Sequence, residues 1–199
     1  MSFCDDGGIK VILLGETFVG KTSLIKVSIG KYFNSKEGTT LTSNYSVKTF
    51  NYNGQEYNFH IWDTIGQEKY RSLTNMFFNN SKIIILVYDI TNLNSFKQLE
   101  YWYNQVVKLI TEENYLLAIV GNKKDLYNNE KVTEEQGKKF AKEKNAKFKL
   151  SSAKDDPLSF INFLEELFKE YIDKNKDKLD KRKGASLKKS KHKKKLKCC

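Results

Sequence analysis

The length, cysteine content and charge of this chain exclude several classes of protein. Its 199 residues suit one domain with a tail. Its three cysteines, two of them C-terminal, are too few for a disulfide framework. No signal peptide begins the sequence and its longest aliphatic run, 83–87, is too short to span a bilayer, so we expect a reducing compartment and neither secretion nor a membrane span. The net charge of +11 equals that of residues 174–199 alone, which hold twelve lysines and one arginine against two aspartates, so the rest of the chain is neutral.

Short apolar runs alternate with helical patterns along the chain, which is typical of parallel βαβ units. Asn53-Gly54 separates two alternating runs and is a hairpin signal, so we expect one antiparallel edge strand. The pattern predicts an α/β fold with a six-stranded, mostly parallel sheet flanked by helices. Strands are expected at 9–14, 45–52, 55–62, 83–88 and 116–120 and just before Ser151, and helices at 21–29, 94–111, 133–144 and 158–172.

The last part of the chain differs from the rest in composition. Beyond Asp173 apolar residues almost vanish and lysine dominates, so this segment cannot bury enough surface to offset the entropy of ordering it. We expect it to be disordered in solution. The chain then divides into a short N-terminal extension at 1–8, one domain at 9–173, and a basic tail at 174–199.

A phosphate-binding loop is predicted directly after the first strand. Gly15 to Thr22 matches the pattern G-x-x-x-x-G-K-[ST], and it follows an apolar strand and opens a helix. Backbone N–H groups of such a loop wrap phosphates, Lys21 reaches the terminal phosphates, and the Thr22 hydroxyl can coordinate Mg²⁺. The alternative, a turn with a surface lysine, fits this strand-to-helix setting poorly. The expected nucleotide contacts are Gly15, Thr17, Phe18, Val19, Gly20, Lys21, Thr22 and Ser23.

A second phosphate motif, Asp63-Thr64-Ile65-Gly66-Gln67, follows a later strand. Its aspartate can hold the metal, the Gly66 N–H can contact a γ-phosphate, and Gln67 can orient an attacking water. Alone this pattern is more often a turn after a strand, but the upstream phosphate loop favours the functional interpretation. Gln67 and Lys21 are therefore the candidate catalytic residues.

Two further loops predict the choice of base. The Asp125 carboxylate can accept hydrogen bonds from N1–H and the 2-amino group of guanine, a donor pair that adenine lacks. Asn122 can bind the N7 side and the Lys123 stem can lie over the base, while the backbone N–H of Ala153 can bind the guanine O6. The residues expected to contact the base are Asn122, Lys123, Asp125, Ser152, Ala153 and Lys154.

In this order and spacing the motifs resemble the nucleotide motifs of Ras-superfamily GTPases over residues 9–173. The stretches 62–74 and 86–92 are similar to signatures of the Rab branch. The resemblance implies a P-loop NTPase fold of the Ras-like G-domain type. It also implies a slow GTPase that binds Mg-GTP, alternates between GTP and GDP, and recruits effectors to membranes in vesicle traffic.

Further site residues come from this resemblance. It implies that Thr40 binds Mg²⁺ beside Thr22 and Asp63, and that Phe33 packs against the guanine. Tyr45, Trp62 and Phe77 fall where Rab proteins place three aromatics that effectors contact, although simple core packing accounts equally well for Trp62.

Departures from the family pattern bear on the rate of hydrolysis. Ile65 stands where the family usually has alanine, close to the metal and γ-phosphate, and Phe18 replaces a small residue of the phosphate loop. One alternative is therefore a hydrolysis-poor, GTP-dependent membrane scaffold. Neither arginine in the chain, Arg71 nor Arg182, is placed as an arginine finger, so we expect catalysis to need an activator in trans.

The C-terminus carries a membrane signal. A basic run ends in Cys198-Cys199, which is similar to the Rab signal for two geranylgeranyl groups, and lysines favour an anionic leaflet. A nucleic-acid-associated protein is the other interpretation of the lysines, but the paired cysteines favour a membrane and we expect no nucleic acid. The resemblance implies an exchange factor, a GTPase-activating protein, a GDP-dissociation inhibitor, a prenylation escort and effectors as partners. We expect a monomer on the cytoplasmic face of an intracellular membrane, with a soluble cytosolic pool.

Overall fold

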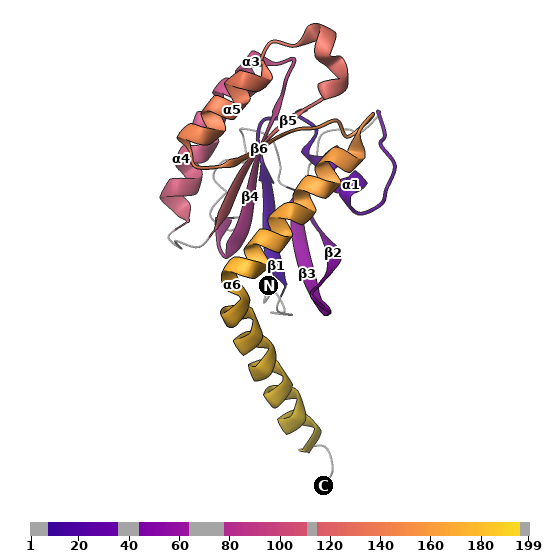
Figure 1. Cartoon of the computed structure of the whole chain (residues 1–199), viewed down its shortest axis with the longest axis vertical. Coiled ribbons are helices and arrows are strands. Elements are labelled where there is room, and N and C mark those ends of the chain that lie inside the picture. Colours follow the sequence, from indigo (N-terminus) through magenta and orange to yellow (C-terminus); the bar gives the residue numbers. More distant parts are fainter. Residues whose placement is uncertain (1–7, 36–43, 64–77, 111–114, 196–199) are drawn as a thin grey trace.

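The fold is a six-stranded sheet with helices on both faces (Figure 1). A computed structural model describes residues 8–35, 44–63, 78–110 and 115–195, with side chains as far as Asp180. The strand order is β2-β3-β1-β4-β5-β6, in which only the β2–β3 pairing is antiparallel, so the predicted fold class is confirmed. The strands are β1 Ile9–Leu14, β2 Asn44–Tyr52, β3 Gln55–Asp63, β4 Ser81–Asp89, β5 Leu116–Asn122 and β6 Lys147–Leu150, and the helices are α1 Lys21–Ser28, α3 Leu93–Lys97, α4 Leu99–Leu109, a 3₁₀ helix Lys124–Asn129, α5 Glu134–Glu143 and α6 Pro157–Lys195.

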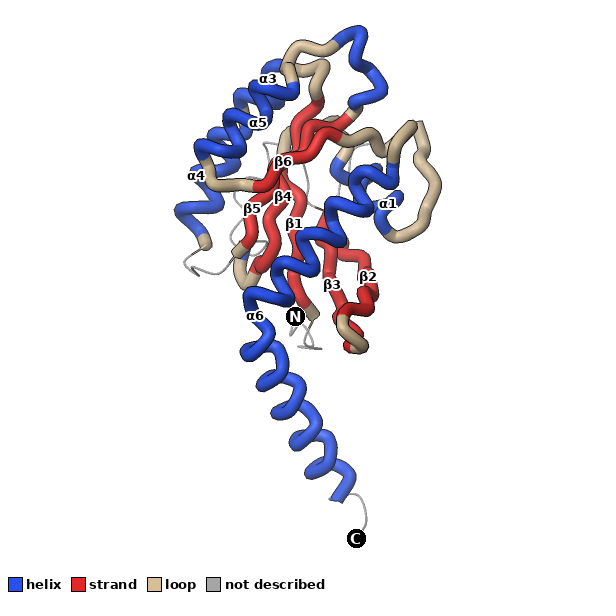
Figure 2. The backbone as a smooth tube through the Cα atoms, in the orientation of Figure 1, coloured by secondary structure: helices blue, strands red, loops and turns tan. Residues whose placement is uncertain are grey.

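Two apolar layers of side chains lie between the sheet and the helices on its two faces. Figure 2 shows the sheet in red between these helices in blue. Alternate residues of β1 point to opposite faces, so Val11 and Leu13 join the layer under α1 and α6, whereas Ile12 and Leu14 join the layer under α4 and α5. All four are buried. Because β1, β4 and β5 are covered by helices on both faces, their sequences are nearly continuous apolar runs, as is usual for parallel strands.

The topology fixes where a ligand can bind. From β1 the chain proceeds to β2 and β3 on one side, whereas from β4 it proceeds to β5 and β6 on the other side. In such sheets the loops diverge at the carboxyl ends of the two central strands and leave a crevice there. The carboxyl ends of the parallel strands β1, β3, β4, β5 and β6 all lie at this edge, and the predicted motifs begin there.

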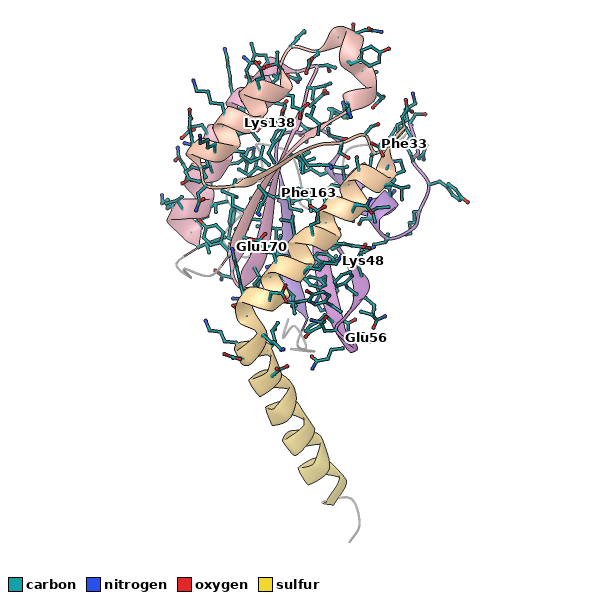
Figure 3. All side chains as sticks on the ribbon, viewed as in Figure 1. Phe33, Lys48, Glu56, Lys138, Phe163 and Glu170 are labelled. Atoms are coloured by element: carbon teal, nitrogen blue, oxygen red, sulfur yellow. The ribbon has the colours of Figure 1, made fainter. Side chains whose placement is uncertain are left out.

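At the opposite edge, α6 packs against the β2–β3 hairpin. The predicted turn is confirmed, with left-handed backbone at Asn53 and Gly54. Phe168 of α6 stacks on Phe59 of β3 at a centroid distance of 3.5 Å, and the Tyr52 hydroxyl donates to Asp173 over 3.1 Å. Figure 3 shows Lys48 on this hairpin and Phe163 and Glu170 along α6. Helix α6 therefore contacts the hairpin through both a ring stack and a hydrogen bond.

Two helix predictions are wrong in their extent. The helix expected to end at Ile172 runs to Lys195, with one non-helical residue at Asn175. Leu179 is only 8% exposed and adds to the core under α6, and lysine is a good helix former. The helix expected at 94–111 consists of two, α3 and α4, which meet at Gln98.

The start of α5 has a capping box, which fits the sequence pattern of a threonine followed three residues later by a glutamine. The Thr133 hydroxyl accepts from the Gln136 N–H over 3.3 Å, and the Gln136 side chain accepts from the Thr133 N–H over 2.8 Å. Across the part of the chain that the structure describes, no helix combines the length and the apolar character that crossing a bilayer requires.

Candidate nucleotide-binding site

The phosphate loop joins β1 to α1 and is bounded by two glycines whose backbone suits glycine alone. Gly15 has φ 146° and Gly20 has φ 94°. A Cβ atom at Gly15 would collide with the Val87 carbonyl oxygen of β4, and one at Gly20 would collide with the Asn122 side-chain amide. The loop can therefore lie against β4 and β5 only because both positions lack a side chain.

Lys21, the first residue of α1, is folded back into this loop. Its ammonium donates to the carbonyl oxygens of Gly15 and Glu16, each over 2.9 Å, and the residue is only 5% exposed. Burial lowers the pKa of Lys21 to about 8, against the opposing effect of the Asp63 and Glu16 carboxylates. The loop thus holds a desolvated cation at its centre, which is the group that a polyphosphate would complement.

A side chain from α4 supports the same loop. The Trp102 indole N–H donates to the Glu16 carboxylate over 3.1 Å, and Trp102 is buried. Within the loop Val19 is buried, whereas Phe18 is 69% exposed. Trp102 has no sequence signal for this role, because no local pattern marks a contact between residues so far apart in the chain.

Oxygen donors suitable for a metal lie beside Lys21. Asp63 ends β3 in register with Leu13 of β1, two residues before the phosphate loop begins, and its charge raises the pKa of Lys21. Thr22 is in the first turn of α1. Carboxylate and hydroxyl oxygens are ligands that Mg²⁺ prefers, so the residues present fit this ion.

One buried side chain joins the phosphate loop to the two loops predicted to bind the base. The Asn122 amide nitrogen donates to the Val19 carbonyl over 2.8 Å, and its amide oxygen accepts from the Ala153 N–H over 3.3 Å. In addition, the Ser152 hydroxyl donates to the Asp125 carboxylate over 2.6 Å, and the Lys154 N–H donates to the Ser152 hydroxyl over 3.2 Å. These contacts bring together residues that the sequence places on separate loops.

Lys123 is held by a residue that the sequence analysis did not assign to the site. Its backbone is left-handed, with φ 66°, and its ammonium lies 2.7 Å from the Asp89 carboxylate. The other oxygen of Asp89 accepts from the N–H and the hydroxyl of Thr91, each over 2.8 Å. Asp89 pairs with Asn122 across β4 and β5. A carboxylate at the end of a strand beside the base loop was the signal that could have identified it.

The predicted aromatic residues lie in two places. Phe33 is in the loop after α1 and is 36% exposed (Figure 3). On the β2–β3 hairpin, Tyr45 stacks on Trp62 and on His60, with centroid distances of 5.0 Å in both cases, and Tyr45 is 42% exposed. Trp62 packs partly against the core under α4, so core packing holds for it as well. Six of the predicted site residues lie outside the described part of the chain, namely Thr40, Gly66, Gln67, Phe77, Cys198 and Cys199.

Comparisons with known proteins agree with this geometry. A sequence model described as "Ras family" matches residues 10–176. The chain is 38% identical to the Ras-related protein SEC4 of Saccharomyces cerevisiae over 86% of this chain and 80% of that protein. It is 39% identical to the Ras-related protein Rab-21 of Homo sapiens over 80% and 68% of the two chains, and 36% identical to the Ras-related protein Rab-18 of Lymnaea stagnalis over 73% and 72%.

Proposed function

This chain belongs to the Ras family and is a Rab-like small GTPase of membrane trafficking, and from that premise we propose which of its residues bind and hydrolyse the nucleotide. Such proteins bind GTP or GDP together with Mg²⁺. The phosphates are bound by the loop from Gly15 to Ser23, with Lys21 as the cation at its centre. The base is bound by Asn122, Lys123, Asp125, Ser152, Ala153 and Lys154, with Phe33 against the guanine.

The observation that carries this proposal is the position of Asn122. A single amide ties the phosphate loop to the loop that holds Ala153, and Asp125 lies in the same assembly through Ser152. A site that recognises a phosphorylated nucleoside needs its phosphate contacts and its base contacts at a fixed separation. Asn122 supplies that separation, which supports binding of an intact guanine nucleotide over binding of free phosphate.

Hydrolysis follows from the same set of residues. Thr22, Thr40 and Asp63 would hold Mg²⁺, which when bound would supply positive charge against the phosphate oxygens. Lys21 stabilises the negative charge that develops on the transferred phosphoryl group, and Gln67 orients the attacking water. Because neither arginine of the chain serves as a cis arginine finger, turnover is slow and an activating protein in trans accelerates it, by roughly 10³- to 10⁵-fold.

The membrane part of the function rests on the C-terminus. Cys198 and Cys199 carry two geranylgeranyl groups, and the lysines before them favour the anionic cytoplasmic leaflet of an intracellular membrane. Tyr45 and Trp62 offer an aromatic surface to effectors, with Phe77. An exchange factor, an activator, a GDP-dissociation inhibitor and a prenylation escort complete the cycle, in which a monomer moves between membrane and cytosol.

Single-turnover hydrolysis tests the catalytic assignment. Pre-bound GTP is converted to GDP on adding Mg²⁺, and the rate is compared between the wild-type chain and Gln67→Leu. We expect the variant to be at least about tenfold slower, because it retains the nucleotide but cannot orient water. Equal rates would remove Gln67 from catalysis and would favour the hydrolysis-poor scaffold suggested by Ile65.

The membrane assignment needs a separate test in cells. Cys198→Ser with Cys199→Ser is expected to move the protein from the membrane fraction to the cytosol while GTP binding is kept. Unchanged membrane recovery of the double variant would contradict lipid anchoring at these cysteines. Salt-sensitive RNA binding that is lost on removing residues 184–199 would support the nucleic-acid interpretation instead.

A further inference from the structure

Two residues of the nucleotide loops, neither of them glycine or asparagine, have left-handed backbone. Within the described ranges, five residues other than glycine have φ between 51° and 66°, namely Phe18, Asn53, Asn80, Lys123 and Asn145. Asparagine tolerates this conformation, whereas bulky side chains rarely adopt it. The two residues that do not tolerate it well, Phe18 and Lys123, both lie in loops that bind the nucleotide.

These two residues flank the hydrogen bond that joins the loops. The Asn122 amide donates to the Val19 carbonyl over 2.8 Å, so Phe18 precedes one partner of this bond and Lys123 follows the other. The conformation of Lys123 has a visible reason, because it is accompanied by the ion pair of its ammonium with Asp89 at 2.7 Å. Strained backbone at a functional site commonly serves to place one side chain.

For Phe18 the reason is not burial. The residue is 69% exposed, while its neighbour Val19 and the following Lys21 are buried, so the loop carries one large apolar group outward at the centre of its phosphate-binding stretch. An exposed ring gains little from the folded chain alone to offset the strained backbone. A ligand that covers the ring would supply that gain by removing apolar surface from water.

We infer that the Phe18 ring packs against the ribose and purine side of a bound guanine nucleotide and slows its release. The inference rests on the proposed function, because the ring acts on the same site. It adds an apolar side-chain contact to a loop whose other expected contacts are polar, through backbone N–H groups, the Lys21 ammonium and the Thr22 hydroxyl. Phe18 and Lys123 then line two sides of the pocket for the nucleoside. They flank the hydrogen bond from the Asn122 amide to the Val19 carbonyl.

The test is the dissociation rate of tritiated GDP from the full-length chain, with excess unlabelled GDP and Mg²⁺ present. An unmodified nucleotide is needed, because a dye on the ribose would itself contact the ring. Phe18→Ala is expected to release GDP about three- to tenfold faster, the effect of losing one aromatic contact. Phe18→Tyr keeps the ring and is expected to restore slow release. A rate for Phe18→Ala within twofold of wild type would overturn the inference.

Two more variants separate the ring from the backbone. Phe18→Gly removes the ring and also relaxes the left-handed conformation, so fast release by this variant alone, with Phe18→Ala unchanged, would assign the effect to the backbone and overturn the inference. Val107→Ala, an exposed position on α4, is expected to leave the rate unchanged. If the wild-type chain retains no GDP, the proposed function itself is contradicted. If the wild-type chain retains GDP and Phe18→Ala releases it at the same rate, only the inference about the ring fails.

Discussion

The two halves of the nucleotide site are built in different ways. The phosphate half is one continuous loop, shaped by Gly15 and Gly20 and by the bonds of Lys21 to carbonyl groups of that same loop. The guanine half is assembled from the ends of β4 and β5 and from the loop after β6, through contacts such as that of Asn122 with Ala153. The phosphate half therefore depends on local sequence, whereas the guanine half depends on the packing of the whole sheet.

The largest effect is expected from the phosphate half. Lys21→Met removes the buried cation and is expected to weaken GDP binding by about 10²- to 10³-fold, because the phosphate charge loses its central partner. Isothermal titration of nucleotide-free protein with GDP measures this. Lys31→Met, which removes an exposed lysine just after α1, serves as the control and is expected to bind as wild type. A loss of less than tenfold in Lys21→Met would show that the loop backbone alone holds the phosphates.

A smaller effect is expected at the joint between the halves. Asn122→Ala leaves the Val19 carbonyl and the Ala153 N–H without their partner and is expected to lower the free energy of unfolding by about 2–3 kcal/mol. Chemical denaturation of the nucleotide-free chain measures this, with the exposed Asn129→Ala as the matched control. Stability unchanged within about 0.5 kcal/mol would mean that the two halves are not coupled through this amide.

The smallest of the three effects is expected on the guanine side alone. Asp89→Asn removes the ion pair with Lys123 and is expected to weaken GDP binding by about three- to tenfold. In a double-mutant cycle, Asp89→Asn should cause almost no further loss of GDP affinity once Lys123→Met is present, because Asp89 acts through that lysine. Fully additive losses would show that Asp89 affects binding by another route and that Lys123 is not positioned by it.

The same contrast explains what the sequence predicted. The phosphate loop, the hairpin turn at Asn53-Gly54 and the capping box at Thr133 were predictable, because each depends on residues within a few positions of one another. Trp102 was not, because its role arises only when distant segments are brought together by the sheet, and Asp89 was marked only by its place at the end of a strand.

Two helix boundaries could not be predicted from the apolar pattern of the sequence. The end of α6 was misplaced because the prediction weighed the lysine-rich composition after Asp173, whereas Leu179, a single apolar residue, continues the buried stripe onto the core. The break at Gln98 was missed because α3 is only five residues long and an apolar pattern continues across it. Short helices and single anchoring residues are decided by packing and not by local propensity.

The central claim is that the two halves act together to select a guanine nucleotide. The most direct measurement is mass spectrometry of the nucleotide that remains bound to freshly purified protein, followed by its displacement with GTP or ATP in the presence of Mg²⁺. We predict bound GDP or GTP that guanine nucleotides displace and ATP does not. An empty site, or equal displacement by ATP, would contradict the assignment of Asn122, Asp125 and Ala153 to the guanine base.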